Sequence, residues 1–343
     1  MNSSIITNNL ISNRYISDGR PILKSDQAAA QEFLTDSRIH YKEVNTCPLC
    51  GHQEAICIAK KERHGLPLDT IVCKQCGLIR SHKQLDEKSL VIFYSEYYRR
   101  IYDVAEDYDR RYSGEEKRNP PKFHSKEQVV LEIGCGGGWN LMPFHKNGYT
   151  YYGYDFDKDL IEYGRRRGLN LFTGGISGAR HRGIQADYLI LDQVLEHVSD
   201  PCEFLIELKS VLNENALINI HLPSVNLLLW GYSDYDLLGT LQNAHNFLFD
   251  DFTLKTIAQK TGFLMVNCAA NNIILRYRKG VAPQELAINS QRGERVVRFL
   301  KLVEFTLKVR RKTGLLKPIK KFYFFVNPIG TLRRAKIEYF GKI

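Results

Sequence analysis

The fold is decided by the stretch Val129-Val130-Leu131-Glu132-Ile133-Gly134-Cys135-Gly136-Gly137-Gly138. An apolar run typical of a buried strand comes first, a glycine cluster follows it, and residues 139–146 have a helical pattern. Glycines suit this turn because the backbone must bend tightly and approach a ligand without a Cβ in the way. The stretch therefore predicts a strand, a ligand-binding turn and a helix, as at the start of a Rossmann-like α/β domain.

Strand and helix patterns alternate after this stretch, which predicts a mostly parallel sheet with helices on both faces. We expect Asp157 and Asp251 to cap two of the helices, and Asp200-Pro201 to supply a cap and a first-turn proline for a third. The pattern predicts strands over 151–155, 169–173, 188–191 and 216–221, helices over 157–168, 200–212 and 251–261, and a closing antiparallel pair over 263–269 and 273–278.

Two carboxylates accompany the glycine turn. Glu132 lies inside the strand before it, and Asp155 ends the next strand, 21 residues after Gly134. An acidic residue at about this spacing hydrogen-bonds the ribose of a nucleoside in such folds. A dinucleotide site would need a third glycine at the position of Trp139, where a bulky side chain would crowd a diphosphate. The pattern thus favours a nucleoside without a diphosphate.

The segment from Leu131 to Gly138 resembles the first motif of class I S-adenosylmethionine (SAM)-dependent methyltransferases, in which an acidic residue precedes Gly-x-Gly-x-Gly. Asp192-Gln193-Val194-Leu195-Glu196-His197 resembles their segment around the methionine end of the cofactor, and His245-Asn246-Phe247-Leu248-Phe249 a later element. The resemblance implies SAM as cofactor. The residues that it implies for binding are Glu132, Gly134, Gly136, Gly138, Asp155, Asp192 and Gln193.

One stretch departs from the pattern of this class. Many members have an acidic residue after the third strand for the adenine amine, whereas residues 173–178 here read Thr-Gly-Gly-Ile-Ser-Gly. That leaves adenine to the backbone and to Ile176.

Methyl transfer is an in-line displacement, and a hydroxyl or amine acceptor must also lose a proton. His197 and His245 are the candidate general bases because a histidine can take a proton at neutral pH. The alternatives are packing or hydrogen bonding to the substrate, and Glu196 could be a structural carboxylate at a helix N-terminus.

Two C-x-x-C-G knuckles lie 22 residues apart, one at Cys47 and Cys50 and the other at Cys73 and Cys76. Four thiolates make a closed tetrahedral zinc site with no open position, so the zinc should be structural. Disulfides are the competing interpretation, which a cytoplasmic setting disfavours. With the knuckles included, residues 45–265 resemble bacterial methyltransferases with an N-terminal zinc ribbon, many of which are thought to modify sugars of surface polysaccharides.

The net charge of +10 belongs to the C-terminal part of the chain. From Arg276 onward, 18 Lys or Arg face four Asp or Glu, a net +14, which leaves 10 − 14 = −4 for the first 275 residues. A long nucleic acid would need the charge around the cleft, so nucleic acid is disfavoured. Residues 295–334 mix basic and apolar side chains, which fits either peripheral contact with an anionic membrane or a helix packed on its own domain.

The sequence divides into an N-terminal arm (1–41), a zinc ribbon (42–85), a helical connector (86–125), a Rossmann-like methyltransferase domain (126–279) and a basic amphipathic segment (280–343). We expect a cytoplasmic protein, without an exporting signal, that methylates a sugar hydroxyl of a nucleotide sugar or a polysaccharide intermediate. An RNA methyltransferase and a non-catalytic scaffold that binds zinc and a nucleoside are the alternatives.

Overall fold

The computed structural model describes residues 6–16, 26–102, 108–109, 112, 123, 125–230, 236–269, 271–284 and 291–313. Residues 114–121 of the connector, where a charged run closed by Asn119-Pro120-Pro121 predicts a linker, and the basic segment after residue 313 lie outside the described residues. Their interpretations stay as predictions.

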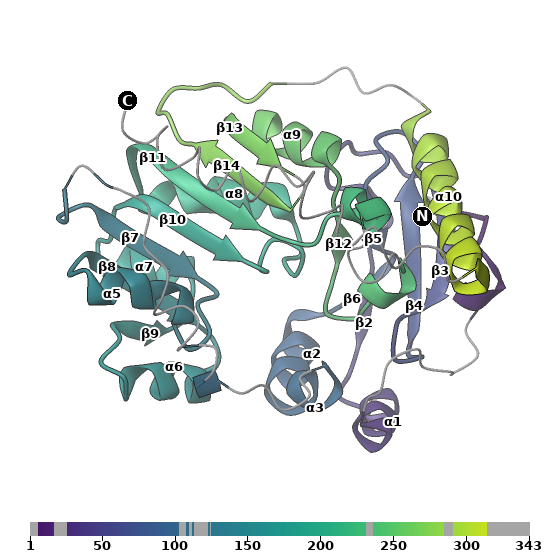
Figure 1. Cartoon of the computed structure of the whole chain (residues 1–343), viewed down its shortest axis with the longest axis horizontal. Helices are drawn as coiled ribbons and strands as arrows, with labels where there is room; N and C mark the ends of the chain where they lie inside the picture. Colours follow the sequence, from purple (N-terminus) through teal and green to yellow (C-terminus); the bar gives the residue numbers. More distant parts are fainter. Residues whose placement is uncertain are drawn as a thin grey trace.

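A seven-stranded sheet forms the larger half of the fold (Figure 1). Its strand order is β13-β14-β11-β10-β7-β8-β9, and β7 to β11 run parallel to their neighbours in this set, while β14 is antiparallel to both β11 and β13. This confirms the predicted parallel sheet and its antiparallel closing pair. The strands are β7 (Val129–Ile133), β8 (Thr150–Asp155), β9 (Leu171–Thr173), β10 (Ala186–Asp192), β11 (Leu212–His221), β13 (Leu264–Ala269) and β14 (Asn272–Arg276).

Alternating side chains of β7 and β10 enter two different cores, because successive residues of a strand point to opposite faces. Leu131 and Leu189 join the core that includes residues of α7, α8 and α9, whereas Val130 and Ile190 join the core beside α5 and α6. Helices therefore cover both faces, as predicted. They are η3 (Trp139–Leu141), α5 (Met142–Lys146), α6 (Lys158–Arg165), α7 (Ile176–His181), α8 (Pro201–Leu208), η4 (Lys209–Val211) and α9 (Asp251–Lys260).

The helix caps agree with the sequence in two cases out of three. Asp157 caps α6, and Asp200 caps α8 with Pro201 in the first turn. The prediction for α9 was wrong by one residue, because Asp250 is the cap and Asp251 is the first helical residue. Asp250 and Thr253 exchange hydrogen bonds in a capping box. Either acidic residue could fill the role, and the pairing with Thr253 selects Asp250.

A second, five-stranded sheet carries the cysteine knuckles and has the order β1-β3-β4-β5-β12. Its last member, β12, comes from far along the chain and pairs antiparallel with β5 through Phe247 and Leu248. The chain then continues from β12 through a helix to β13 of the seven-stranded sheet, so this stretch of backbone connects the two sheets (Figure 1). The strands are β1 (Ile6–Asn8), β3 (Ala55–Lys61), β4 (Pro67–Cys73), β5 (Ile79–Ser81) and β12 (Phe247–Leu248), with a separate pair β2 (Tyr41–Glu43) and β6 (Lys83–Leu85).

In the predicted helical connector, residues 87–102 are helical, and most of the connector after Tyr102 lies outside the described residues. Phe93 and Tyr97 are buried against Phe33 of α1 in a small aromatic core. The shorter elements are η1 (Asn13–Tyr15), α1 (Gln27–Thr35), α2 (Glu87–Ile92), a π-helical turn η2 (Phe93–Tyr97), α3 (Tyr98–Tyr102), η5 (Val225–Trp230) and η7 (Leu238–Thr240).

The long C-terminal helix α10 (Arg292–Thr313) packs along the five-stranded sheet (Figure 1). Val297, Leu300 and Val303 are buried there in one core with Ile58 and Val72. The first part of the basic segment is thus a helix packed on its own domain, one of the two interpretations from the sequence.

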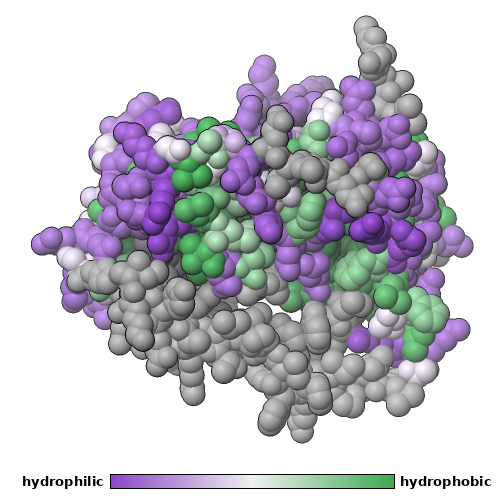
Figure 2. Space-filling model, turned by 90° about the horizontal axis from the view of Figure 1, so that it is seen from above, coloured by the Kyte–Doolittle hydropathy of each residue, from purple (hydrophilic) through white to green (hydrophobic). Residues whose placement is uncertain are grey.

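No helix in the described ranges combines the length and the apolarity that a membrane crossing requires. Figure 2 shows one face of the molecule, where hydrophilic residues dominate and hydrophobic ones form smaller patches between them.

Candidate functional site: cofactor loop and acceptor cluster

The glycine turn between β7 and η3 has the backbone conformation that its sequence predicts. Gly134, Gly136 and Gly138 have φ angles of 73°, 53° and 80°, in the left-handed region that favours glycine. A Cβ at Gly134 would lie 2.5 Å from Val194, and a Cβ at Gly136 would lie 2.7 Å from the ring of Trp139. The turn is therefore closed on one side by packed side chains, and only glycine fits there.

Asp155 lies at the carboxyl end of β8, where the sequence predicts a ribose contact. One carboxylate oxygen accepts a hydrogen bond from the backbone N–H of Gly136 at 2.7 Å, and the other accepts from Asp157 at 2.8 Å. Burial raises the pKa of Asp155, against the effect of these two donors. The glycine turn and the carboxylate are thus directly connected.

An aromatic residue that the sequence reasoning missed lies next to Asp155. Phe156 is 79 % exposed, which is unusual for a phenylalanine. Its ring lies against Gly175, at the start of α7, since a Cβ there would come within 3.2 Å of it. Ile176, the residue considered for adenine, is 5 % exposed and packs in the core next to Gly175, so its contact with adenine stays a prediction. The signal that could have found Phe156 is an aromatic side chain directly after the acidic residue.

Glu132 and Asp192 share one partner. The side-chain amide of Asn140 donates to Glu132 at 2.8 Å and to Asp192 at 3.0 Å, and Glu132 is fully buried. The amide fixes both carboxylates at the carboxyl ends of neighbouring strands. Asn140, on the first turn after the glycines, was not among the predicted site residues.

Gln193 follows Asp192 with a φ of 57°, a conformation that residues other than glycine, asparagine and aspartate rarely adopt. Its N–H donates to the carbonyl of His221 at 2.8 Å, and its amide lies 3.3 Å from Nδ1 of that ring. His221 Nδ1 also lies 2.8 Å from a carboxylate oxygen of Asp192. The pair of Asp192 and His221 was missed because the two residues lie on separate strands.

Glu196, His197 and His245 form a compact cluster after β10. One ligand atom of each residue lies within 4.8 Å of those of the other two, and the rings of the two histidines are 4.8 Å apart. Both histidines predicted as bases are therefore brought together. Glu196 is fully buried, and neither of its carboxylate oxygens has a hydrogen-bond partner among the described residues.

The hydrogen bonds of His197 fix its tautomer. Nδ1 lies 2.8 Å from the carbonyl oxygen of Ala244, which can only accept, so Nδ1 carries the proton and Nε2 keeps the lone pair. The hydroxyl of Tyr94, from the π-helical turn η2, lies 2.9 Å from the same Nδ1.

Burial controls the charges of the cluster. It lowers the pKa of His197 to about 4 and raises the pKa of Glu196 to about 8. The pKa of His245 is lowered well below its ordinary value, by burial first and then by the nearby His197 and Arg63. Both imidazoles are consequently neutral at pH 7, with a lone pair on each ring.

The five-stranded sheet holds the segment that carries His245. The backbone N–H of Ser81 in β5 donates to the carbonyl of Asn246 at 2.9 Å, and its hydroxyl donates to the carbonyl of His245 at 3.1 Å. On the other side, the N–H of Asn246 donates to the carbonyl of Glu196 at 2.8 Å, and its amide donates to the carbonyl of His197 at 2.9 Å. The cluster is therefore positioned jointly by both sheets.

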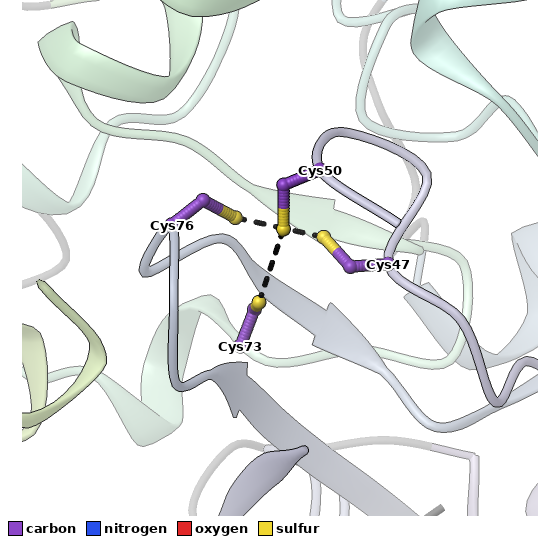
Figure 3. Close-up of side chains that lie close together, drawn as sticks. All are labelled: Cys47, Cys50, Cys73 and Cys76. Atoms are coloured by element: carbon purple, nitrogen blue, oxygen red, sulfur yellow. Dashed lines mark hydrogen bonds between the residues drawn. The ribbon is translucent and has the colours of Figure 1, made fainter. Parts of the chain in front are cut away.

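The four cysteines of the two knuckles point toward one centre (Figure 3). The sulfur atoms of Cys47 and Cys76 are 3.5 Å apart, as are those of Cys50 and Cys73. Zinc–sulfur bonds of about 2.3 Å in a tetrahedron place sulfur atoms about 3.8 Å apart, so the donor set fits zinc. Gly51 and Gly77 have φ angles of 74° and 77° and close each knuckle by donating to the carbonyls of Cys47 and Cys73.

The fold and the glycine turn define a class of protein. A parallel sheet closed by an antiparallel strand between two others, with helices on both faces, is the Rossmann-like fold of class I methyltransferases. Residues 104–267, just under half of the chain, match a family model described as a methyltransferase domain. The chain thus carries a SAM-dependent methyltransferase domain.

Several solved structures are similar to part of the chain. The CurJ carbon methyltransferase shares 17 % identity over 48 % of this chain and 51 % of its own, with a TM-score of 0.34. A SAM-dependent methyltransferase from Archaeoglobus fulgidus shares 20 % identity over 59 % of this chain and 84 % of its own, with a TM-score of 0.33. An O-methyltransferase family protein from Burkholderia thailandensis shares 12 % identity over 50 % and 55 %, with a TM-score of 0.36.

The chain spans about half of the length of the CurJ carbon methyltransferase. Among curated proteins, no significant match was found.

Proposed function

We propose that this methyltransferase transfers the methyl group of SAM to a hydroxyl of a sugar, in a nucleotide sugar or a polysaccharide or lipopolysaccharide intermediate. The observation that supports the proposal best is that Tyr94 lies between Asp155, beside the glycine turn, and the polar cluster of Glu196 and the two histidines. Its hydroxyl contacts His197, and its pKa is raised by burial and then by charges that include both Glu196 and Asp155. One side can hold an adenosine and the other an oxygen acceptor. The sugar is favoured over RNA by the net charge of −4 on residues 1–275, since RNA would be repelled.

SAM supplies an activated methyl group on a sulfonium. In the proposed site, Asp155 accepts hydrogen bonds from the ribose hydroxyls, and the ring of Phe156 lies against adenine. Glu132, Asp192 and Gln193, with the backbone of Gly134, Gly136 and Gly138, bind the methionine end. His197 accepts the proton of the acceptor hydroxyl at Nε2, because Nδ1 is already protonated. His245 is the second candidate base.

The cofactor assignment can be tested with S-adenosylhomocysteine in calorimetry. We expect an Asp155→Ala variant to bind it at least about tenfold more weakly, because a hydrogen bond to a charged group contributes about 1.5–3 kcal/mol. Asp159→Ala is the matched control, since Asp159 is exposed on the first turn of α6. Equal binding by the Asp155 variant would contradict the assignment.

The acceptor is identified by transfer of a labelled methyl group. We expect label on nucleotide sugars or glycan intermediates and none on RNA transcripts. Label on RNA alone would overturn the sugar proposal, and cofactor binding without transfer to any acceptor would favour the scaffold alternative.

We further propose that Cys47, Cys50, Cys73 and Cys76 bind a structural zinc ion. The fit of the sulfur spacing supports this. Four protein thiolates would leave no position for a water molecule, so the ion would contribute to folding and take no part in the reaction.

A peripheral contact with an anionic membrane through residues 295–334 is also proposed, for the described part of this range. Three apolar residues of α10, Leu302, Phe305 and Val309, are 53 %, 63 % and 38 % exposed and lie three and four residues apart, on one face. Exposed basic residues flank them, namely Arg298, Lys301, Lys308 and Lys312. Such a face suits the surface of an anionic bilayer.

A further inference from the structure

The cluster of Glu196, His197 and His245 brings a buried carboxyl group close to two imidazole rings. Glu196 is 0 % exposed, and no described group donates to either carboxylate oxygen. A buried carboxylate without a partner costs several kcal/mol, so such groups are normally paired or bound to a cation. The carboxylate needs a positive charge or a proton between itself and the two rings.

The two imidazoles are prepared as ligands. Nδ1 of His197 donates to the carbonyl of Ala244, which fixes the ring and leaves Nε2 available. On His245, the side-chain amide of Gln242 contacts Nε2, while Nδ1 makes no hydrogen bond within the described residues. A histidine that binds a metal is usually held in this way, by a hydrogen bond from the protein to its other ring nitrogen.

The distances between the three donor atoms can be compared with the distances between ligand atoms around one metal ion. Oxygen and nitrogen ligands lie about 2.0–2.2 Å from such an ion, so two of them are at most about 4.4 Å apart. The three donor atoms here lie within 4.8 Å of one another. Two donor atoms on opposite sides of the ion would need to approach by a few tenths of an ångström, and two neighbouring ones, which lie about 3.0–3.6 Å apart around such an ion, by up to about 1.8 Å.

We propose that Glu196, His197 and His245 bind a divalent first-row transition-metal ion, separate from the four-cysteine site. Two nitrogen donors and one carboxylate are a set that such ions accept, with positions left open. Val194, two residues before Glu196, packs on Gly134 of the cofactor turn. Tyr94, which contacts His197, lies close enough to both Glu196 and Asp155 for burial and then their charges to raise its pKa. In the proposed site, the open positions accept oxygen atoms of an acceptor placed beside the cofactor turn. A hydroxyl bound to the ion would lose its proton more readily.

The role of the ion rests on the proposed function, whereas its binding does not. If the ion is bound, His197 and His245 act as ligands and not as bases. A proton on Glu196, donated to one of the rings, is the competing arrangement, and it predicts that no metal binds.

The test is a calorimetric titration of Co²⁺ into the full chain carrying one equivalent of zinc. We expect one further equivalent to bind, and at least tenfold weaker binding in the Glu196→Gln and His245→Asn variants. The control is His181→Asn, which removes an exposed histidine at the end of α7 and should leave the titration unchanged.

Binding of S-adenosylhomocysteine is measured in parallel, because it shows that each variant is folded and tests the methyltransferase separately. No second equivalent in the unmodified chain would overturn the proposal, even if both variants failed to fold. If both variants are folded and still bind the second equivalent of Co²⁺ with unchanged affinity, the proposal is overturned as well. Metal binding without S-adenosylhomocysteine binding would instead contradict the proposed function.

Discussion

Glu62 is a buried carboxylate in the turn after β3. One oxygen accepts from the backbone N–H groups of His64 and Leu66, at 2.8 and 3.1 Å. Burial nevertheless raises the pKa of Glu62 to about 7, with these donors opposing the shift. The folded state then binds a proton that the unfolded state has already released between about pH 4.5 and 7. Stability therefore falls as the pH rises through this window.

Replacing Glu62 with glutamine should remove this pH dependence. We expect Glu62→Gln to gain stability relative to the unmodified chain between pH 5 and pH 8, by up to about 3 kcal/mol, since one pKa unit corresponds to about 1.4 kcal/mol. Denaturant unfolding at the two pH values measures it. Glu54→Gln is the control: Lys74 lowers the pKa of the exposed Glu54, so its replacement should give a small change of opposite sign. Parallel pH profiles for Glu62→Gln and the unmodified chain would refute the prediction.

Residues whose role is set by local sequence could be predicted, and residues whose role is set by tertiary contacts could not. Asp155 and the glycines were found because a strand, a turn and a spacing identify them. Asn140 and His221 were missed because their partners, Asp192 among them, come from other strands. The cap of α9 was placed one residue late, since two adjacent aspartates offer the same chemistry and only the bond to Thr253 separates them.

At the scale of elements, α6 and the glycine turn approach more closely than the sequence indicates. A Cβ at Gly164 of α6 would lie 2.2 Å from the carbonyl oxygen of Gly137 and 2.4 Å from Leu171. The contact with Gly137 involves a backbone oxygen, which cannot move away unless the whole turn moves. Gly164 thus sets the distance between the helix and the cofactor turn.

We expect Gly164→Ala to destabilise the protein by about 1–3 kcal/mol, as overpacking in a closed site does, and to weaken S-adenosylhomocysteine binding. Gly178→Ala in α7 is the matched control: its Cβ would meet only the ring of Tyr154, 3.0 Å away, and alanine favours a helix by about 1 kcal/mol. Denaturation and calorimetry on both variants give the comparison. A Gly164→Ala protein as stable as the control would show that the turn adapts.

The two short strands at the edges of the five-stranded sheet mark the limit of sequence reasoning for elements. β1 covers Ile6–Asn8 and β12 covers Phe247–Leu248, too short for any periodicity. The residues of β1 fall in the predicted N-terminal arm, and those of β12 in the predicted methyltransferase domain. Pairing with β3 and β5 decides both, and pairing is a property of the folded chain.

For the whole molecule, the knuckles join three parts of the chain. A Cβ at Gly293 of α10 would lie 2.5 Å from the carbonyl oxygen of Cys73, and the N–H of Gly293 donates to the carbonyl of Lys74 at 2.9 Å. Arg292 forms an ion pair with Asp250, the cap of α9. The second knuckle, α10 and the methyltransferase domain are therefore in direct contact.

Loss of the proposed zinc should consequently affect more than the ribbon. We expect a Cys73→Ser, Cys76→Ser chain to fall from about one zinc per chain to none and to unfold at lower denaturant concentration, with weaker S-adenosylhomocysteine binding. The reason is that β5 holds the segment of His245 and β12. Metal analysis and calorimetry measure both, with Cys268→Ser as the control that should keep its zinc. Zinc retained by the double variant would refute the four-thiolate site.

The outer face of α10 allows a test of the proposed membrane contact at the scale of the whole molecule. Its inner face is already buried on the five-stranded sheet, so only the stripe of Leu302, Phe305 and Val309 with its basic neighbours can meet a bilayer. We expect the full chain to co-sediment with vesicles that contain anionic lipid, with an affinity that falls as salt rises, because each nearby Lys or Arg contributes about 1 kcal/mol. Replacing the three apolar residues with glutamine should weaken binding at least tenfold while leaving S-adenosylhomocysteine binding intact, since none of them lies near the cofactor turn. Binding that is unchanged in this variant, or equally strong to vesicles without anionic lipid, would show that α10 does not make the contact.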